Sequence, residues 1–342
     1  MARGKTVLVS GGSGFLGGWC VVELLRRDYD VRTTVRSLDR EAEVRSRTAS
    51  QVSGADDRLT VLAADLTSDA GWAEAVAGCD YVLHVASPFP PAQPKDPDEL
   101  IVPAREGTLR VLRAALDAGV KRVVVTSSVA SIGASPRDSA GPLTEDDWTD
   151  ASHPAVTPYA QSKTIAERAA WDLVRERGDE SRLAVVNPGA IIGPVLSEDR
   201  SYSIELVERL MKGTPGSPRI GFSVVDVRDV ADLEIRAMTD PAAGGKRFIA
   251  VDRFMSMEDV ATVLRDRLGP AASKVPTRKV PNFVVRAMAR FDPGLRTVKA
   301  QLGKRQEYSN ERARSTLGWN PRPVEDAIAE TGTSLVDVGV AG

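Results

Sequence analysis

Short apolar runs alternate with longer stretches of helical periodicity along the first half of the chain. The apolar runs predict buried β-strands, and apolar residues that recur every three or four positions predict amphipathic helices. The predicted strands are Thr6–Ser10, Val31–Val35, Leu59–Ala63, Tyr81–Val85, Arg122–Ser127 and Leu183–Asn187. The predicted helices are Phe15–Arg27, Ala70–Ala77, Leu100–Ala118 and Pro158–Glu176. This alternation predicts a parallel sheet covered by helices on both faces.

The pattern changes after Asn187, where glycine and proline become frequent. Two stretches, NPGAIIGP and KGTPGSPRIG, are typical of loops. Helices are predicted near Ile204–Met211 and Asp229–Met238, a strand over Lys246–Val251, and a mostly helical part from about Met257. We therefore expect an α/β fold, a Rossmann-type doubly wound parallel sheet with a smaller, mostly helical C-terminal domain at the edge where such sheets bind ligands.

The composition is ordinary for a globular protein: of 342 residues, 42% are hydrophobic and 27% charged. A formal net charge of −2 argues against general affinity for nucleic acid or anionic membranes. The two cysteines fit a reducing compartment, and neither a signal peptide nor a run of membrane-spanning length is present in the sequence. We expect a cytoplasmic monomer or homodimer whose partner is a small molecule.

Five glycines follow the first predicted strand in the sequence GGSGFLGG, three of them before the first predicted helix and two in its first turn. The stretch Gly12–Gly17 matches G-x-G-x-x-G, and Gly11, Gly14 and Gly17 match G-x-x-G-x-x-G. Such a turn lets backbone approach a phosphate, toward which the helix N–H groups point. A glycine-rich turn without a ligand is the alternative. The position at the start of a βαβ unit favours the pyrophosphate of a dinucleotide.

The second predicted strand ends in Val35-Arg36-Ser37, with no acid at its tip. NAD-binding units place Asp or Glu there to bond the ribose 2′-hydroxyl, whereas a guanidinium pairs with a 2′-phosphate. We therefore expect Arg36 to select NADP over NAD, helped by Ser37 and Arg40. A solvated loop charge is the alternative for Arg36. Asp65, after the third predicted strand, is expected to bond the adenine amino group.

Tyr159 and Lys163 are four residues apart near the start of a predicted helix and so share one face. The reference pKa of a phenol is about 10. A neighbouring ammonium lowers that pKa, which lets a tyrosine exchange a proton with a carbonyl or alcohol. By itself the pair is also compatible with a surface helix that carries a partly buried tyrosine.

Three hydroxyl residues, Thr126, Ser127 and Ser128, end the fifth predicted strand at the carboxyl edge of the sheet. A serine at that edge can hydrogen-bond a substrate oxygen as its charge changes. Hydroxyl groups at a strand end are also ordinary turn chemistry. Their combination with the glycine turn and the Tyr/Lys pair favours a catalytic site.

These motifs resemble those of the extended short-chain dehydrogenase/reductases. Within that family they are similar to the branch of dihydroflavonol reductases, cinnamoyl-CoA reductases and aldehyde/ketone reductases. The segments that carry the resemblance, in family order over about the first 195 residues, are GGSGFLGG, TTVRS, DYVLHVASPF, EGTLRVLRAA, VVVTSSVASI, PYAQSK and NPGAIIGP. FSVVDVRDVAD and SNERARSTLGWNPRP extend it further along the chain.

The resemblance implies a Ser–Tyr–Lys catalytic set. Tyr159 would protonate the carbonyl oxygen, and Lys163 would lower the pKa of Tyr159 and bond the nicotinamide ribose. Ser128 would hold the substrate oxygen, with Ser127 as the open alternative. Glu43 lies near the position at which the plant enzymes often have a basic residue for the 2′-phosphate, so strict NADP selection stays open.

The glycine turn, the strand ends and the resemblance together define an expected set of cofactor contacts. They are Gly11, Ser13, Gly14, Phe15, Leu16, Gly17, Arg36, Ser37, Asp65, Leu66, Val85, Ala86, Ser87, Thr126, Lys163, Pro188 and Gly189. Residues 1–190 are expected to form the NADP-binding domain, to which later segments such as 220–252 return. Residues 191–342 are expected to form mainly the substrate-binding domain.

The expected function is that of an NADPH-dependent carbonyl reductase, in which hydride reaches a ketone or aldehyde while Tyr159 supplies the proton. One alternative is an NAD-dependent sugar-nucleotide epimerase or 3β-hydroxysteroid-type dehydrogenase on the same fold. Epimerases typically have an acid after the second strand, which this chain lacks. The other alternative is a non-catalytic NADP-sensing protein, a class that usually loses the tyrosine or the lysine.

The substrate pocket is expected to form from the loops after Ser128, after Asn187 and over Ser201–Phe222. Candidate lining residues are Ala130, Ile132, Ile192, Val195, Tyr202 and Phe222. Such an apolar lining suits an aromatic or aliphatic ketone better than a sugar nucleotide. The sequence predicts neither the physiological substrate nor the stereochemistry of the product alcohol.

Several residues with reactive or charged side chains are expected to have structural roles. His84, at the end of the fourth predicted strand, is expected to be a hydrogen-bonded core histidine, and His153 an exposed loop residue. Cys20 is expected to pack in the first helix, and REAEVRSR is expected to be a solvated helix face. No cluster of His, Cys and carboxylates has metal-ligand spacing, so no metal is expected.

Overall fold

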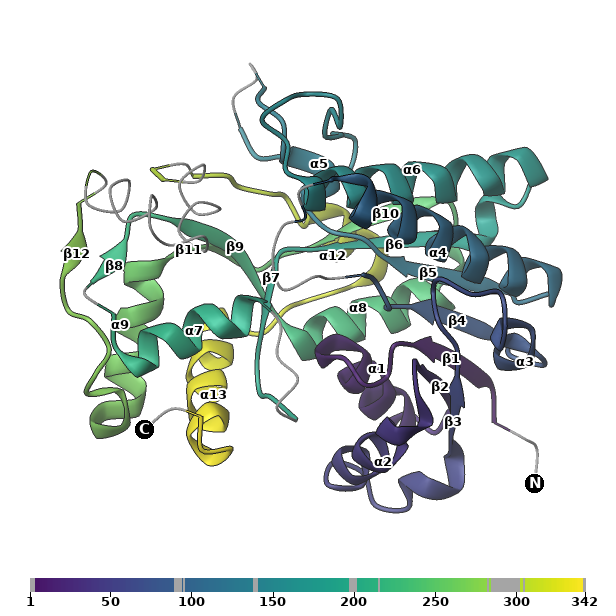
Figure 1. Ribbon diagram of the computed structural model, residues 1–342, viewed down its shortest axis with the longest axis horizontal. Helices are drawn as coiled ribbons and strands as arrows, with labels where there is room; N and C mark the ends of the chain where they lie inside the picture. The colour runs from purple at the N-terminus through teal and green to yellow at the C-terminus, as the bar shows by residue number, and fades with distance from the viewer. Residues whose placement is uncertain are drawn as a thin grey trace. The chain divides into compact units, whose positions relative to one another are not determined.

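The computed structural model describes residues 4–88, 94, 96–137, 141–196, 202–214, 216–281, 283, 302–303 and 305–340. The chain divides into two compact units, whose elements are labelled in Figure 1. Unit 1 consists of Met1–Pro188, Arg228–Ala250 and Asn310–Asn320, and unit 2 of Gly189–Val227, Val251–Ser309 and Pro321–Gly342. The segment Asn310–Asn320 therefore packs with unit 1, although residues 191–342 were expected to form mainly the second domain.

A seven-stranded parallel sheet forms the centre of unit 1, with strand order β10-β6-β5-β4-β1-β2-β3. The strands are β1 Thr6–Ser10, β2 Asp30–Val35, β3 Leu59–Ala63, β4 Tyr81–His84, β5 Arg122–Thr126, β6 Leu183–Pro188 and β10 Lys246–Ala250. The predicted Rossmann-type fold is confirmed. The central strands read as continuous apolar runs because helices cover both of their faces.

Helices α4 and α6 pack side by side on one face of this sheet, and α1 and α8 lie on the other (Figure 1). The helices of unit 1 are α1 Phe15–Arg26, α2 Glu41–Ala49, α3 Trp72–Val76, α4 Asp98–Asp117, α5 Ala130–Gly133, α6 Pro158–Arg177, α8 Val227–Thr239, which begins one residue before the unit does, and α12 Glu311–Leu317. Single 3₁₀ turns occur at Leu38–Arg40, Ala55–Arg58, Glu180–Arg182 and Pro241–Ala243.

Local sequence explains where helix α6 begins and ends. Thr157 is its N-cap and accepts a hydrogen bond from the Ala160 N–H, while Pro158 occupies the first helical position. Gly178 ends the helix with a positive φ of 68°. These signals place Tyr159 in the first turn of the helix, next to the carboxyl ends of the strands.

Unit 2 contains two small sheets. β7 Ala190–Ile192 and β11 Arg253–Ser256 flank β9 Gly221–Asp226, and β8 Ser217–Pro218 pairs with β12 Lys279–Val280. Its helices are α7 Tyr202–Lys212, α9 Met257–Leu268 and α13 Val324–Asp337, with a 3₁₀ turn at Gly269–Ala272. The expectation that NPGAIIGP is a loop was wrong, because β9 offers a backbone partner and pairs with Ala190–Ile192 in parallel.

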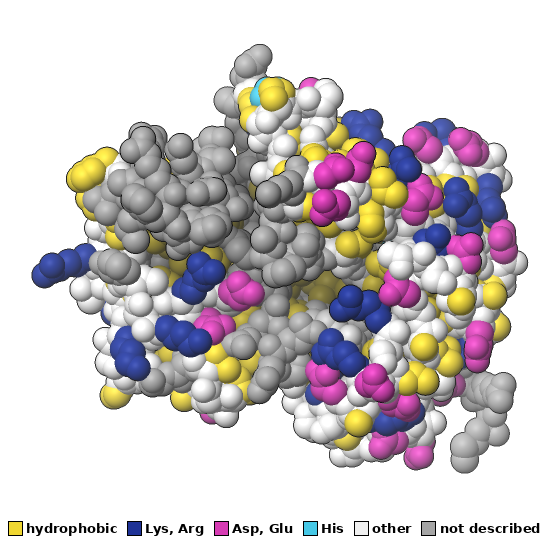
Figure 2. Space-filling model, viewed as in Figure 1, with side chains coloured by type: hydrophobic (Ala, Val, Ile, Leu, Met, Phe, Trp, Pro, Cys, Tyr) yellow, Lys and Arg dark blue, Asp and Glu magenta, His cyan; other side chains and the backbone are white. Residues whose placement is uncertain are grey.

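The solvated helix face expected for REAEVRSR was also partly wrong. Val44 and Arg47 of α2 are buried, and the Arg47 guanidinium donates to the Ser13 carbonyl in the glycine turn at 2.8 Å. On the face shown in Figure 2, basic and acidic side chains are interspersed, in keeping with the net charge of −2. Within the described ranges, no helix is both long and apolar enough to cross a membrane.

Candidate active site

The glycine turn between β1 and α1 is required in part by the protein's own packing. Gly11 has a positive φ of 74°, and a Cβ there would come within about 3.0 Å of Ala86. A Cβ on Gly12 would overlap the Thr33 hydroxyl, and one on Gly17 would overlap the Gly11 carbonyl. These three positions therefore need glycine whether or not a ligand binds.

Gly14 is different, because a Cβ at this position would meet only the Gly11 carbonyl, at an ordinary 3.4 Å. It is the N-cap of α1, yet no side chain caps the helix and no acid lies in its first turn. The positive end of the helix dipole and bare backbone thus face the same point, which suits a phosphate. The turn fits the pyrophosphate of a dinucleotide.

Several charged and polar side chains follow β2, and most of them are already bonded to one another. Arg40 pairs with Glu43 at 2.8 Å, and Ser37 exchanges hydrogen bonds with Asp39. Arg36 is exposed and forms no ion pair with any residue that the structure describes. The expected helper role of Arg40 is therefore weakened by Glu43, and Arg36 is the cation available for a 2′-phosphate.

Asp65 follows β3 and is fixed by its own turn. Its carboxylate accepts from the Thr67 N–H and hydroxyl, both at 2.7 Å, and these bonds lower the pKa of Asp65. Leu66 packs against Gly107 of α4. Beyond β4, the Ala86 N–H donates to the Ser10 hydroxyl at 3.0 Å, which ties the Val85–Ser87 segment to the end of β1.

Tyr159 and Ser128 meet at the carboxyl edge of the sheet. The Ser128 hydroxyl accepts from the Ala130 N–H at 3.1 Å and hydrogen-bonds the Tyr159 phenol. Burial raises the pKa of Tyr159, and the bond from Ser128 opposes that rise. The phenol therefore keeps its proton at neutral pH.

Lys163 lies one turn further along α6 and is partly exposed. Its ammonium donates to the Thr126 carbonyl at 3.3 Å, and burial lowers the pKa of Lys163 to about 8. The carboxylates of Glu167 and Glu234 oppose this shift. The expected lowering of the Tyr159 pKa by Lys163 is absent from this arrangement, in which the ammonium is bonded to Thr126 and the phenol to Ser128.

The structure distinguishes the two candidate serines. The Ser127 hydroxyl points into the protein and donates to the buried Glu167 carboxylate at 2.5 Å. The same carboxylate accepts from Ser131, from Asn187 and from the Arg247 guanidinium, which pairs with it at 2.5 Å. Ser128 is therefore the serine at Tyr159, and Ser127 belongs to a buried polar cluster.

Glu234 is a buried carboxyl that the sequence reading missed. It lies on α8, where it accepts from the Thr126 hydroxyl and from the Cys20 thiol, the latter at 3.3 Å. Burial raises the pKa of Glu234 to about 7 and that of Cys20 well above its usual value. Glu234 follows the apolar Val227 and Val230 by seven and four positions, so it lies on the same, buried face of the helix. This spacing is the sequence feature from which its burial could have been predicted. Cys20 therefore donates a hydrogen bond in addition to packing.

The remaining predicted residues fall in both units. Pro188 ends β6 in unit 1, and Gly189 begins unit 2, where a Cβ would overlap the Ser223 carbonyl. Ala130 begins α5 in unit 1. Ile132 lies on the same helix. The remaining substrate candidates lie in unit 2, with Ile192 on β7, Val195 shortly after it, Phe222 on β9 and Tyr202 at the start of α7, although the side chain of Tyr202 and all of Ser201 lie outside the described residues.

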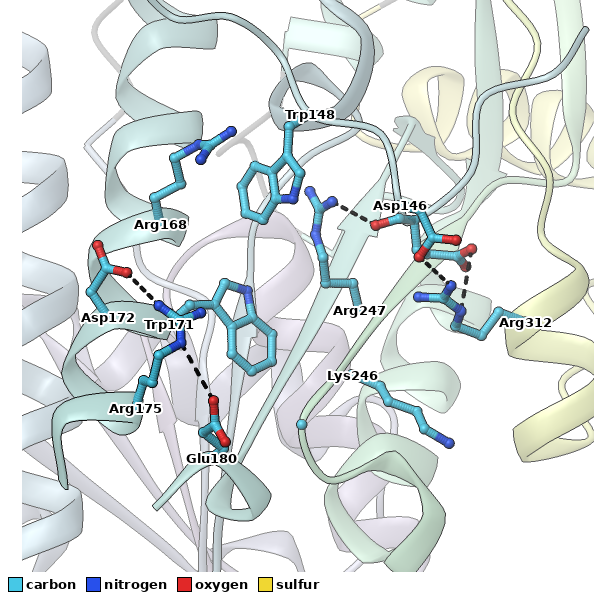
Figure 3. Close-up of a pocket in the computed structure, with 12 residues that line it drawn as sticks. Asp146, Trp148, Arg168, Trp171, Asp172, Arg175, Glu180, Lys246, Arg247 and Arg312 are labelled. Atoms are coloured by element: carbon cyan, nitrogen blue, oxygen red, sulfur yellow. Dashed lines mark hydrogen bonds and ion pairs between the residues drawn. The ribbon is translucent and has the colours of Figure 1, made fainter. Parts of the chain in front are cut away.

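Unit 1 also has a hollow of about 570 Å³, which is lined by charged residues and two tryptophans (Figure 3). Trp148 lies between the guanidinium groups of Arg168 and Arg247, at 4.4 and 3.7 Å from the ring centre. Arg175 pairs with Asp172 and Glu180. Because most of its charges are mutually paired and it contains no tyrosine, serine or histidine, it is not the catalytic site. No described group of His, Cys, Asp and Glu could hold a metal ion.

Comparison of the chain with protein-family models identifies the class of protein to which this fold and site belong. Residues 7–250 match the model of the NAD dependent epimerase/dehydratase family. The chain belongs to this family.

Its relatives are reductases. The chain is 36% identical over 269 residues to the cinnamoyl-CoA reductase CAD2 of Medicago truncatula, covering 77% of this chain and 81% of the relative. It is 32% identical over 340 residues to cinnamoyl-CoA reductase 1 of Petunia hybrida, covering 98% and 93%. Yeast methylglyoxal/isovaleraldehyde reductase Gre2, solved in complex with NADPH, matches with a TM-score of 0.81 and 26% identity, covering 98% and 99%. The chain is therefore an oxidoreductase of the extended short-chain dehydrogenase/reductase family, as its motifs predicted.

The two glycines Gly14 and Gly17 provide a test of the turn. Gly17→Ala is expected to destabilise the fold by about 1–3 kcal/mol because its methyl group overlaps backbone. Gly14→Ala is expected to cost under about 1 kcal/mol but to weaken NADPH binding, because its methyl group enters the space left for phosphate. Thermal unfolding and fluorescence titration with NADPH measure both effects. Undiminished NADPH affinity in Gly14→Ala would contradict this assignment of the turn.

The raised pKa of Glu234 predicts a pH-dependent stability. Between its ordinary pKa of 4.5 and the folded value of about 7, the folded chain holds a proton that the unfolded chain releases. The stabilisation is thus complete below the lower value and is lost as the pH rises through the upper one. Glu234→Gln cannot ionise, so its melting temperature relative to the wild type is expected to rise between about pH 5 and about pH 8.

The control for this experiment is Glu74→Gln on the exposed surface of α3, for which the difference from the wild type is expected to stay constant over the same range. A constant difference for Glu234→Gln as well would show that the carboxyl of Glu234 is not perturbed by burial.

Proposed function

We propose that the protein is an NADPH-dependent carbonyl reductase that reduces a ketone or aldehyde to an alcohol, with Tyr159 as the proton donor. The observation that carries the proposal is the hydrogen bond between Ser128 and the protonated, half-buried Tyr159, with Lys163 on the next turn of the same helix. Unit 1 would bind the cofactor and unit 2 would supply most of the substrate contacts.

The residues of unit 1 fit NADPH. The Gly11–Gly17 turn and the N-terminus of α1 would hold the pyrophosphate, and Arg36 the 2′-phosphate. The Val85–Ser87 segment follows β4, which is next to β1, and Asp65 follows β3, which lies beyond β2 in the sheet. The complex of yeast Gre2 with NADPH supports this choice of dinucleotide. When bound, the reduced nicotinamide supplies the hydride.

The catalytic residues act on the carbonyl oxygen. Because Ser128 accepts from the Ala130 N–H, its own hydroxyl hydrogen is free to be donated, either to the phenol or to a substrate oxygen. Hydrogen bonds from Ser128 and Tyr159 stabilise negative charge as it develops on that oxygen. Tyr159 then transfers its proton to the oxygen, and Lys163, one helical turn further along, would bond the nicotinamide ribose.

The substrate is proposed to be an apolar ketone or aldehyde. Ile192 is buried within unit 2, and Phe222 is partly exposed on β9. The relatives include cinnamoyl-CoA reductases and the dihydroflavonol 4-reductase of Zea mays, and yeast Gre2 is named a methylglyoxal/isovaleraldehyde reductase. A panel that contains each of these carbonyl types is therefore the first activity screen, followed as loss of NADPH absorbance.

Replacement of the proton donor tests the mechanism. Tyr159→Phe removes the phenolic proton and is expected to lower kcat by about 10²–10⁴-fold while the Kd for NADPH stays within about threefold. The assay is turnover of the best carbonyl in the panel beside a binding titration. The matched control is Tyr29→Phe, which lies outside the site and is expected to keep full activity. Full activity in Tyr159→Phe would show that Tyr159 is not the proton donor.

Replacement of the exposed cation tests cofactor selection. Arg36→Asp is expected to lower the NADPH-to-NADH ratio of kcat/KM at least about tenfold, because a carboxylate repels the 2′-phosphate and accepts from a 2′-hydroxyl. Arg40→Ala is the control, since that guanidinium is already bonded to Glu43. An unchanged ratio in Arg36→Asp would refute the role of Arg36 and favour NAD-dependent chemistry on this fold.

A further inference from the structure

A small cavity lies beneath the catalytic lysine on the side of the sheet that α4 and α6 cover. Its volume is about 10 Å³, close to the space that one water molecule needs. Its walls include His84 of β4, Thr108 of α4, Ser127 after β5, and Lys163 and Glu167 of α6. A site this small and this polar suits a single water rather than an organic ligand.

One wall of the cavity carries a buried polar atom without a partner. The His84 side chain is only 2% exposed, and its Nε2 has no hydrogen-bond partner in the described structure. The other ring nitrogen, Nδ1, lies 2.9 Å from the Ser10 hydroxyl. A buried donor or acceptor left unsatisfied is costly, so Nε2 calls for a partner that the protein itself does not supply.

The hydrogen-bond network assigns the proton on the ring. Ser10 accepts from the Ala86 N–H, which leaves its hydroxyl hydrogen to donate to Nδ1 of His84. Burial and the nearby Lys163 lower the pKa of His84 to about 3, so the ring is neutral. A neutral ring that accepts at Nδ1 carries its hydrogen at Nε2. Nε2 is therefore a donor.

The Lys163 ammonium, which also lines the cavity, has N–H groups that are available to donate. Of its three N–H groups, one is used by the Thr126 carbonyl, and no other acceptor is recorded for it among the described residues. A water oxygen can accept one bond from Lys163 and one from His84. Its two hydrogens then find acceptors in the hydroxyl oxygens of Thr108 and Ser127 or in the Glu167 carboxylate, all of which line the cavity.

We propose that this cavity binds one water molecule that bridges Nε2 of His84 and the ammonium of Lys163, and that His84 is thereby a positioning residue for the catalytic lysine. The bridge holds the flexible lysine side chain from below, so that its remaining donor is directed to the catalytic edge of the sheet. The proposal rests on the proposed function of Lys163 and adds a buried residue to it. His84 thus has a role beyond that of a core histidine.

Two substitutions separate the two ends of the imidazole ring. The amide nitrogen of His84→Gln reaches the position of Nε2 and can donate into the cavity, but the bond to Ser10 is lost. The amide of His84→Asn reaches the position of Nδ1 and keeps a partner for Ser10, but nothing donates into the cavity. Both introduce an amide into the same buried site, so thermal unfolding is expected to show similar losses of stability.

The positioning role predicts that His84→Gln keeps kcat/KM within about threefold of the wild type and that His84→Asn loses about tenfold or more, because small displacements of a catalytic group are costly. A purely structural role, in which His84 anchors Ser10 and the segment after β4, predicts the opposite order. Equal losses in the two variants, or full activity in His84→Asn, would overturn the proposal.

A crystal structure of the wild-type protein with NADPH gives a readout that does not depend on turnover. Electron density for a water within hydrogen-bond distance of both Nε2 of His84 and Nζ of Lys163 is expected. Its absence would overturn the proposal. If the wild type reduces no carbonyl, the proposed function is wrong, and the electron density still shows whether the water is bound. If Tyr159→Phe is inactive and the two His84 variants lose activity equally, the proposed function stands and only the water bridge is wrong.

Discussion

The buried carboxylate of Glu167 is the interaction on which the geometry of the catalytic edge depends. It accepts from Ser127, Ser131 and Asn187 and pairs with Arg247, so the ends of β5 and β6, helix α5 and strand β10 are all tied to helix α6. Loss of one partner from a buried ion pair typically costs about 3–5 kcal/mol, because the other charge is left uncompensated. The cluster therefore fixes the loop after β5 relative to the first turns of α6.

This constraint explains why two adjacent serines have different roles. Successive residues of an extended chain point to opposite sides, so once Ser127 is bonded to Glu167, Ser128 is turned toward Tyr159. The same helix that carries Glu167 carries Lys163 one turn earlier. The Glu167 carboxylate therefore also opposes the lowering of the Lys163 pKa that burial causes, and Glu234 does the same from α8.

Local pattern was enough to predict the strands of the large sheet, the glycine turn and the Tyr/Lys spacing, because each depends on neighbours within a few positions. The sequence could not predict the pairing of Glu167 with Arg247, which is 80 residues away, or show that Asn310–Asn320 packs with unit 1. Strand β7 was missed because its partner, β9, is distant in sequence and because the glycine and proline residues on either side of Ala190–Ile192 indicate a loop. Glu234 was missed because a charged residue on a helix is usually solvated.

The perturbed pKa values of the site are consistent with an acid rather than a base at Tyr159. Burial raises the pKa of the phenol and lowers that of Lys163 to about 8, so in the free protein the ammonium loses its proton before the phenol does. Such a phenol is inert until a stronger base appears beside it. In the proposed reaction, the oxygen that has received a hydride would be that base, since an alkoxide holds a proton more strongly than a phenolate. In the proposed reaction, proton transfer from Tyr159 is thereby coupled to reduction.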